Sequence, residues 1–439
     1  MATNPQTGAQ TSAGLSSAAA AHASGTSGAT VRDPRLDFYR GIAMFIILFA
    51  HTPGNFFTSW IPARWGFSDA TEIFVFCSGM ASAIAFGRTF DRAGWVLGTS
   101  RVVYRVWQVY WAHIGMFFFI AMMLAFWDSF GIFEKRYIGT LNLIPFFDGV
   151  TRGGELISTT ADQMIGIFTL SYVPNYFDIL PMYMAILVMM PFVMALSRIN
   201  VYLMFAAILM VWFFAQGRIF GMWDAEALSL NFPAEPWSKR EWFFNPFGWQ
   251  LVFFTGFAFM RGWIPAPPVK VWLIGLALLI VLANVPLSNI GVRAVNREWF
   301  GLVMDGNPVV SWRRANQFLI TKSDFGLLRY VHFLSLAYLF WVAAGEGGRR
   351  LIASGSNVAS KAWGALIGII MKVGQQSLAV FVFSMVFARI SGFTMDQIGR
   401  DTWTVVAVNF VGVGALIGVA YFVAWIKGTP WKSKKAPAR

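Results

Sequence analysis

The sequence predicts an all-α polytopic membrane protein, a bundle of about ten transmembrane helices. Of its 439 residues, 57% are hydrophobic and only 13% are charged, and the mean hydropathy is +0.57. Soluble domains typically carry about 25% charged residues. Apolar runs of about 20 residues, the length needed to cross a bilayer, recur along the whole chain. A lipid bilayer is therefore the expected surrounding of most of this chain.

The apolar runs divide the chain into helices and connections in a definite order. Ten helices are expected at residues 36–54, 69–87, 103–127, 174–196, 201–220, 246–261, 271–289, 326–345, 363–389 and 403–426. The connections at 128–173 and 290–325 are long, and loops of that length are often functional. Residues 1–30, which lack Asp, Glu, Lys and Arg, are expected to be a disordered tail. The membrane domain is then 31–426, and 427–439 is a basic tail at the membrane surface.

The charges indicate an orientation for this bundle. Placing both termini in the cytoplasm leaves more Lys and Arg on the cytoplasmic side and most of the Asp and Glu outside, in agreement with the positive-inside rule. The net charge of +13 is then mostly a consequence of topology, and no nucleic-acid partner is expected. The single cysteine, Cys77, rules out a disulfide within the chain and is expected to be a small buried hydrophobic residue.

Residues 32–51, RDPRLDFYRGIAMFIILFAH, form the most informative stretch of the chain. Eleven residues separate Arg40 from His51, which at about 100° and 1.5 Å per residue puts both on one helix face roughly 16 Å apart. An ionisable group inside a membrane helix is costly and is by default a functional-site hypothesis. A cation near one surface and an imidazole near the other indicate chemistry that spans the bilayer.

Two carboxylates are candidates to orient that imidazole as a catalytic base is oriented. Glu72 lies one turn inside the helix that begins SDATEIFVFCSG, at residues 68–79. Asp178 lies at the outer end of the fourth helix, which starts NYFDILPMYM. Either acid could instead have a purely structural role, because the helix dipole favours a negative charge at a helix start. Ser68 or Asp69 would then be the N-cap of the helix that contains Glu72.

Basic residues gather at the cytoplasmic side of the second and third helices. Arg101, Arg105 and Gln108 share a stripe in RVVYRVWQVYWAH, and Arg88 and Arg92 precede it. Arg forks match phosphate oxygens, so this cluster could hold an anionic cofactor such as coenzyme A. The alternative is ordinary positive-inside anchoring. His113, deeper in the same helix, is a further candidate, or it forms a hydrogen bond to a neighbouring helix.

Three later segments supply further polar candidates. FFNPFGWQLVFF places Trp249 and Gln250 in the outer part of the sixth helix, where the indole could stack on a sugar or anchor the membrane interface. LRYVHFLSLAYL spaces Arg329 and His332 by three residues. GQQSLAVF puts Gln376 in an otherwise apolar helix. HExxH, CxxC, Walker and GxSxG motifs are absent from the sequence, so metal sites, nucleotide hydrolysis and a lipase-type serine have no support.

Taken together, these segments resemble the OpgC family of membrane acyltransferases, which is related to the wider acyltransferase type 3 superfamily. The matching pieces are RLDFYRG with the following His51, SDATEIFVFCSG, RVWQVYWAH, FDILPMY, FNPFGWQL, VHFLSLAYL and GQQSL. The resemblance implies an inner-membrane succinyltransferase that takes succinyl-CoA, or another acyl-CoA, as donor and osmoregulated periplasmic glucans as acceptor. No permanently bound cofactor is expected. GQQSL departs from a GQHSL-like form, so Gln376 stands where a histidine role would be expected.

The resemblance also suggests roles for the candidates. Arg40, Arg88, Arg101 and Arg105 would hold coenzyme A at the cytoplasmic mouth, and His51 would act as general base on a sugar hydroxyl. Glu72 or Asp178 would orient the imidazole. His332, Arg329 or Gln376 would stabilise the oxyanion or a succinyl carboxylate. Direct transfer and an acyl-histidine intermediate both remain open.

Two other functions fit the same residues. A transporter of an acyl donor or a lipid-linked sugar could use the ionisable groups as a relay, and it would accumulate substrate without forming a covalent product. A scaffold subunit of a glucan-synthesis complex would show no activity of its own, and its histidines would be dispensable.

Overall fold

The structure is a computed structural model that describes residues 33–293, 301 and 307–432, with one compact unit that begins at Pro34. The expected disordered tail at 1–30 and residues 433–439 of the basic tail lie outside the described residues. The α-helices are α2 Pro34–His51, α3 Pro62–Trp65, α4 Ala70–Ser82, α5 Arg88–Ser129, α6 Ile144–Asp148, α7 Thr160–Thr169, α8 Ile179–Ile199, α9 Val201–Phe214, α10 Gly217–Gly221, α11 Pro246–Met260, α12 Val271–Asn284, α13 Pro308–Ala315, α14 Gln317–Ile320, α15 Leu327–Ala344, α16 Val358–Gln375, α17 Ser377–Ile398 and α18 Thr402–Lys427. A hairpin of β1 Val150–Arg152 and β2 Glu155–Ser158 lies in the long connection after α5.

The helices confirm a mostly helical membrane protein. Five helical segments are long and apolar enough to cross a bilayer: Ala70–Ser129, Ile179–Ile199, Leu327–Ala344, Ser377–Ile398 and Thr402–Lys427. The helices α9, α11 and α12 are apolar but shorter, with 14, 15 and 14 residues. The number of ten spans and the cytoplasmic placement of the termini stay predictions.

Three of the expected helices are joined or divided differently in the structure. The predicted helices at 69–87 and 103–127 correspond to α4 and α5, and a π-helical turn at Ala83–Gly87 joins the two. Gly94 breaks α5 with φ 80° and ψ 179°, a conformation that glycine adopts without a Cβ clash. The predicted helix at 363–389 is interrupted at Gln376, where α16 ends and α17 begins.

Small residues let the central helices approach closely. A Cβ on Gly79 of α4 would lie 1.9 Å from the Phe253 carbonyl oxygen of α11. A Cβ on Gly374 of α16 would lie 1.9 Å from the Asp37 carbonyl oxygen of α2. Membrane helices have little hydrophobic drive to associate, so such close backbone contact is how they gain packing energy. These contacts fix α4 on α11 and α16 on α2.

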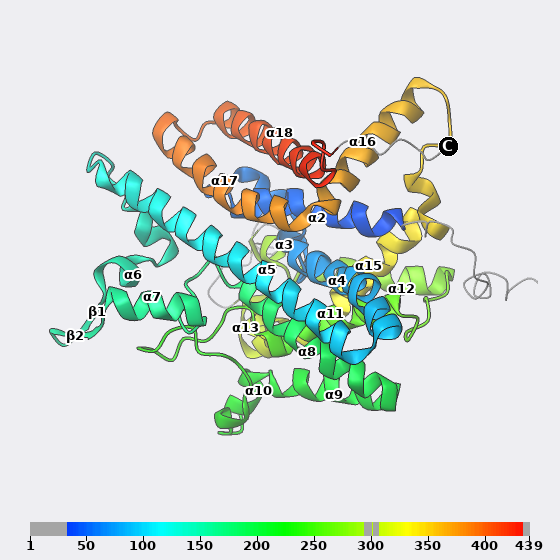
Figure 1. The fold of residues 1–439 in the computed structure, drawn as a ribbon, viewed down its shortest axis with the longest axis horizontal. Coiled ribbons are helices and arrows are strands. Elements are labelled where there is room, and N and C mark those ends of the chain that lie inside the picture. The colour runs from blue at the N-terminus through cyan, green and yellow to red at the C-terminus, as the bar shows by residue number, and fades with distance from the viewer. Residues whose placement is uncertain (1–32, 294–300, 302–306, 433–439) are drawn as a thin grey trace, which may run out of the picture. The chain divides into compact units, whose positions relative to one another are not determined.

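The helices place their polar ends in two groups. We call the first the histidine end: it joins the last turn of α2, the C-terminal half of α17 and the first turns of α4, α8, α11 and α15. We call the second the arginine end: it joins the start of α2, the start of α17 and the last turns of α8, α11 and α18 to the start of α5. Figure 1 shows α17 and α18 running side by side, with α17 next to α2.

Candidate functional site

His51 is the last residue of α2, at the histidine end. Its Nδ1 lies 2.8 Å from the Ile47 carbonyl oxygen. A carbonyl oxygen only accepts, so this hydrogen bond puts the proton of a neutral imidazole on Nδ1 and leaves the lone pair on Nε2. No residue in the described part of the chain forms a hydrogen bond with Nε2. The backbone of α2 thus fixes the tautomer that a general base needs.

The His51 side chain lines a cavity of about 280 Å³. Two cations, Lys135 and Arg389, line it together with Tyr137, Tyr176 and the carboxylate of Asp396. Its apolar wall includes Trp127, which stacks on Phe393 with the ring centroids 4.1 Å apart. The cavity combines a base, cations, hydroxyls and an aromatic wall, which is the mixture expected of a small-molecule site.

Arg389 and Tyr176 hold the end of α2 in place. The Arg389 guanidinium donates a hydrogen bond of 2.9 Å to the carbonyl oxygen of His51 and lies 4.4 Å from the centre of the Tyr176 ring. The Tyr176 hydroxyl donates to the Met385 carbonyl oxygen at 2.6 Å, and its ring meets the His51 ring edge to face at 5.4 Å. Tyr176 does this with φ +90°, an unusual value for a residue that has a Cβ.

A buried charge network lies next to this cavity. Glu72, fully buried, pairs with Arg329 at 2.6 Å and accepts the Asp69 backbone N–H at 2.8 Å. Asp69 caps α4 and pairs with Lys322 at 2.5 Å. Both carboxylates of this network are therefore neutralised by cations of the histidine end. The capping box confirms Glu72 as a helix-start acid of α4.

The hydrogen-bond partner of the imidazole differs from the expected one. Neither Glu72 nor Asp178 forms a hydrogen bond with His51, since Ile47 occupies Nδ1. Asp178 is buried at the start of α8 and accepts the Phe243 backbone N–H at 3.3 Å. The hypothesis that a carboxylate orients the base directly is corrected to orientation by the helix backbone.

His332 faces the charge network rather than the cavity. The Ser68 backbone N–H donates to its Nδ1 at 3.3 Å, and the Ser68 hydroxyl oxygen lies 2.7 Å from the same nitrogen. The neutral ring therefore carries its proton on Nε2. A Cβ on Gly66 would lie 2.3 Å from that nitrogen, so the residue at this position must be small.

Three other candidates are buried between helices. Trp249 is fully buried and donates to the Lys322 carbonyl oxygen at 2.9 Å, so its indole neither anchors the membrane interface nor offers a face to a sugar. Gln250 donates to the Ile208 carbonyl oxygen at 2.7 Å and joins α11 to α9. His113 is buried in α5, and neither ring nitrogen has a hydrogen-bond partner among the described residues, which corrects the expected bond to a neighbouring helix.

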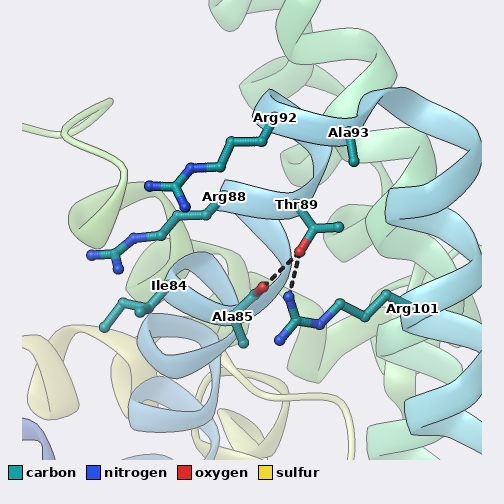
Figure 2. Close-up of a pocket in the computed structure, with 7 residues that line it drawn as sticks. All are labelled: Ile84, Ala85, Arg88, Thr89, Arg92, Ala93 and Arg101. Atoms are coloured by element: carbon teal, nitrogen blue, oxygen red, sulfur yellow. Dashed lines mark hydrogen bonds between the residues drawn. The ribbon is translucent and has the colours of Figure 1, made fainter. Parts of the chain in front are cut away.

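The arginine end holds a second cavity, of about 460 Å³ (Figure 2). Arg88, Arg92 and Arg101 line it, so the structure brings together three of the basic residues that the sequence singles out. Arg101 donates to the Thr89 hydroxyl at 2.5 Å. Arg88 and Arg92 have no ion-pair or hydrogen-bond partner for their side chains in the part of the chain that the structure describes. Their charges are available to an external anion.

The remaining basic candidates lie elsewhere at the same end. Arg40 donates to the Ser377 hydroxyl and so joins α2 to α17. Arg105 donates to Gln108 at 3.2 Å. Lys427 donates to Gln376 at 2.8 Å.

The position of Gln376 corrects one part of the sequence-based hypothesis. It precedes Arg389 by 13 residues along α17, about 20 Å at 1.5 Å per residue. Because Arg389 is the residue that contacts His51, Gln376 lies too far from the imidazole to stabilise an oxyanion there.

Several residues of the histidine-end cavity were not among the sequence candidates. Arg389 and Asp396 are the clearest, because each is an isolated charge in the apolar run of α17, and an intramembrane ionisable residue is itself a signal. Lys135 and Tyr137 belong to the long connection after α5, whose length alone indicated function. Tyr176 carries no sequence signal, because its importance comes from its backbone conformation.

A comparison with known families adds to this geometry. The family described as "OpgC protein" matches residues 32–428, nearly the whole chain. The chain belongs to the OpgC family. OpgC membership gives it an acyltransferase-type activity at a membrane, in the modification of glucans. No curated protein and no solved structure matches the chain.

Proposed function

We propose that this OpgC protein is a transmembrane O-acyltransferase of the bacterial inner membrane. It moves a succinyl group from cytosolic succinyl-CoA to a hydroxyl of a periplasmic glucan, and His51 is the general base. The observation that carries the proposal is the tautomer of His51: Nδ1 is bonded to the Ile47 carbonyl oxygen, and the ring lines a cavity that contains two cations.

The chemical step follows from that tautomer. The glucan hydroxyl gives its proton to Nε2 of His51 while its oxygen attacks the thioester carbonyl carbon. The carbon–sulfur bond then breaks, and the coenzyme A thiolate takes the proton back from the imidazolium. An ester and a free thiol result, so the imidazole is unchanged at the end of the cycle. The Ile47 carbonyl stabilises the imidazolium between the two steps, because Nδ1 keeps its hydrogen bond throughout.

The arginine end suits the donor. Arg88 and Arg92 have no partner among the described side chains, and a coenzyme A phosphate supplies the anion that they lack. With both termini in the cytoplasm, this end faces the cytosol and His51 faces the periplasm. Along α2, Arg40 at the arginine end and His51 at the histidine end are about 16 Å apart, and the acyl arm must reach from one end to the other.

The test is mass spectrometry of periplasmic glucans from cells that lack the protein, complemented with wild type or variants. Wild type should restore the mass increment of a succinyl ester. His51→Asn should not, because asparagine can still donate to the Ile47 carbonyl oxygen but has no basic nitrogen to accept the hydroxyl proton.

Thr52→Val is the matched control. The Thr52 hydroxyl donates to the Leu48 carbonyl oxygen at 2.9 Å, the same bond one residue later, but Thr52 does not line the cavity. It should restore succinylation fully. Succinylated glucan in His51→Asn cells would contradict the assignment of the base. An unmodified glucan in all strains, with a substrate that accumulates across the membrane, would favour a transporter.

A further inference from the structure

Arg389 is a partly buried cation that forms no ion pair with any carboxylate of the described residues. It is placed in the apolar helix α17 and lines the histidine-end cavity beside His51. One of its Nη groups is bonded to the His51 carbonyl oxygen, and its Nε is buried with no hydrogen-bond partner in the described part of the chain. A guanidinium in such a place is costly to desolvate unless an anion neutralises it.

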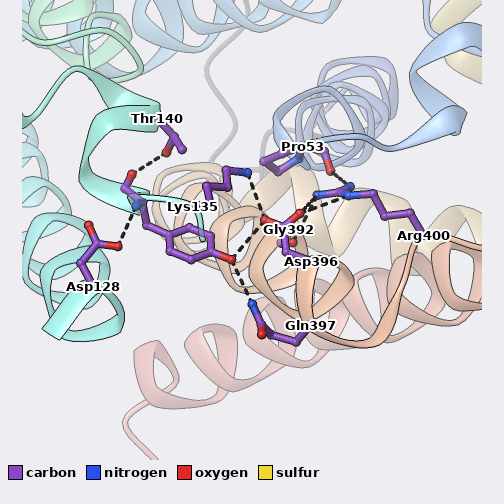
Figure 3. A network of polar contacts seen from close by, with 9 residues as sticks. Pro53, Asp128, Lys135, Thr140, Gly392, Asp396, Gln397 and Arg400 are labelled. Atoms are coloured by element: carbon purple, nitrogen blue, oxygen red, sulfur yellow. Dashed lines mark hydrogen bonds and ion pairs between the residues drawn. The ribbon is translucent and has the colours of Figure 1, made fainter. Parts of the chain in front are cut away.

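The neighbouring cations differ from Arg389 in this respect. Asp396 pairs with Lys135 at 3.0 Å and with Arg400 at 2.6 Å, as Figure 3 shows. In the adjoining network Lys322 pairs with Asp69, and Arg329 pairs with Glu72. Arg389 forms no ion pair with any described carboxylate, although Asp396 lines the same cavity. Among these cations, only Arg389 has no carboxylate partner in the described part of the chain.

We infer that Arg389 binds the distal carboxylate of the acyl group and makes the site selective for dicarboxylic monoacyl donors over neutral ones. This inference rests on the proposed function. The planar guanidinium can bind a carboxylate through two parallel hydrogen bonds, which a neutral acyl chain cannot form. Two methylene groups separate the carboxylate of a succinyl group from its reacting carbonyl, so both ends fit one cavity that holds Arg389 and His51.

Lys135 is less suited to this role. It is exposed and already neutralised by Asp396, and its ammonium lies 5.4 Å from the Tyr137 ring. The stack of Arg389 on Tyr176 also restricts the guanidinium plane, so fewer conformations are lost when a carboxylate binds.

The experiment compares two non-transferable thioether analogues, of succinyl-CoA and of butyryl-CoA, which have similar chain lengths but differ in charge. Their dissociation constants are measured on the purified full chain in detergent. Wild type should prefer the succinyl analogue. Arg389→Gln should raise the dissociation constant of the succinyl analogue by roughly 10- to 100-fold, the range for loss of a charged hydrogen-bonding group. It should raise the dissociation constant of the butyryl analogue by less than about threefold.

Arg400→Gln is the matched control, because Arg400 lies on the same segment, pairs with Asp396 and does not line the cavity. It should leave the preference unchanged. Arg389→Lys, which keeps the charge without the fork, should keep a reduced preference and supplies the test if Arg389→Gln does not fold.

Equal weakening of both analogues by Arg389→Gln would overturn the inference, since it would mean that Arg389 only supports the fold or the oxyanion. Wild-type glucan succinylation with no change of preference in the variant would also overturn it while the proposed function stands. An Arg389-dependent preference without any acyl transfer would support the inference and refute the proposed function.

Discussion

The Arg389 guanidinium donates a 2.9 Å hydrogen bond to the backbone carbonyl oxygen of His51. The last carbonyl groups of an α-helix lack intrahelical partners and carry partial negative charge, so a cation there both satisfies and stabilises the helix end. Arg389 thereby ties the end of α2 that carries the proposed base to α17. The cavity next to His51 keeps its shape only as long as these two helices stay in register.

The Tyr176 ring contacts both His51 and Arg389, and these ring contacts are expected to matter more for activity than its hydroxyl. Tyr176→Phe loses the 2.6 Å bond to the Met385 carbonyl oxygen but keeps the contacts with His51 and Arg389, so we expect most of the transfer activity to remain. Tyr176→Ala removes those contacts and should lower glucan acylation at least tenfold. The measurement is the rate of acyl transfer by purified protein.

The backbone of Tyr176 supplies an internal control. Because φ is +90°, Tyr176→Gly relieves strain of about 1–3 kcal/mol that Tyr176→Ala retains. Both variants should lose activity, but the glycine variant should unfold at a higher temperature. A glycine variant less stable than the alanine variant would show that this backbone conformation is not strained.

The buried pair of Glu72 and Arg329 should show strong coupling. Removing one partner leaves a buried charge without its counter-ion, at a cost of about 3–5 kcal/mol. Glu72→Gln and Arg329→Met should therefore each lower the unfolding temperature markedly, and the double variant should lose less than the sum of the two. Thermal unfolding of the four proteins in detergent gives the coupling energy. Simple additivity would mean that the two charges do not depend on each other.

Sequence patterns predicted several residues of this site, but they did not predict which residues form hydrogen bonds with them. The apolar runs indicated the helices, and single ionisable residues within them indicated His51, Glu72 and Arg329. The partner of His51 could not be predicted, because any helix residue can use the carbonyl four residues earlier, and only the side-chain rotamer shows that His51 does so. The burial of Trp249 could not be predicted, because Phe325 and the Lys322 carbonyl oxygen, which contact the indole, come from a segment far away in sequence.

Close packing of α4 on α11 gives a prediction about stability alone. Gly79→Ala would push a Cβ into the Phe253 carbonyl oxygen, which belongs to backbone and cannot move cheaply, so we expect a loss of about 1–3 kcal/mol. Gly115→Ala is the control, because Gly115 is helical and open space surrounds its Cβ position. It should be neutral or stabilising by up to about 1 kcal/mol. Similar unfolding temperatures for the two variants would contradict the packing of α4 and α11.

The arginine-end cavity should control donor affinity and leave the chemical step unchanged. Arg88 and Arg92 line this cavity and have no partner for their side chains among the described residues (Figure 2), so Arg88→Gln with Arg92→Gln removes charge without breaking an internal contact. We expect KM for the acyl-CoA to rise about tenfold or more, with kcat within about twofold of wild type, because these residues bind the donor equally in its ground and transition states. The KM of wild type should also rise with salt, and that of the double variant much less.

Arg136→Gln is the control. The half-exposed side chain of Arg136 pairs with Asp148 at 2.8 Å, and Arg136 belongs to the connection that lines the histidine-end cavity. A KM unchanged in the double variant, or raised equally in Arg136→Gln, would remove coenzyme A phosphates from the arginine end.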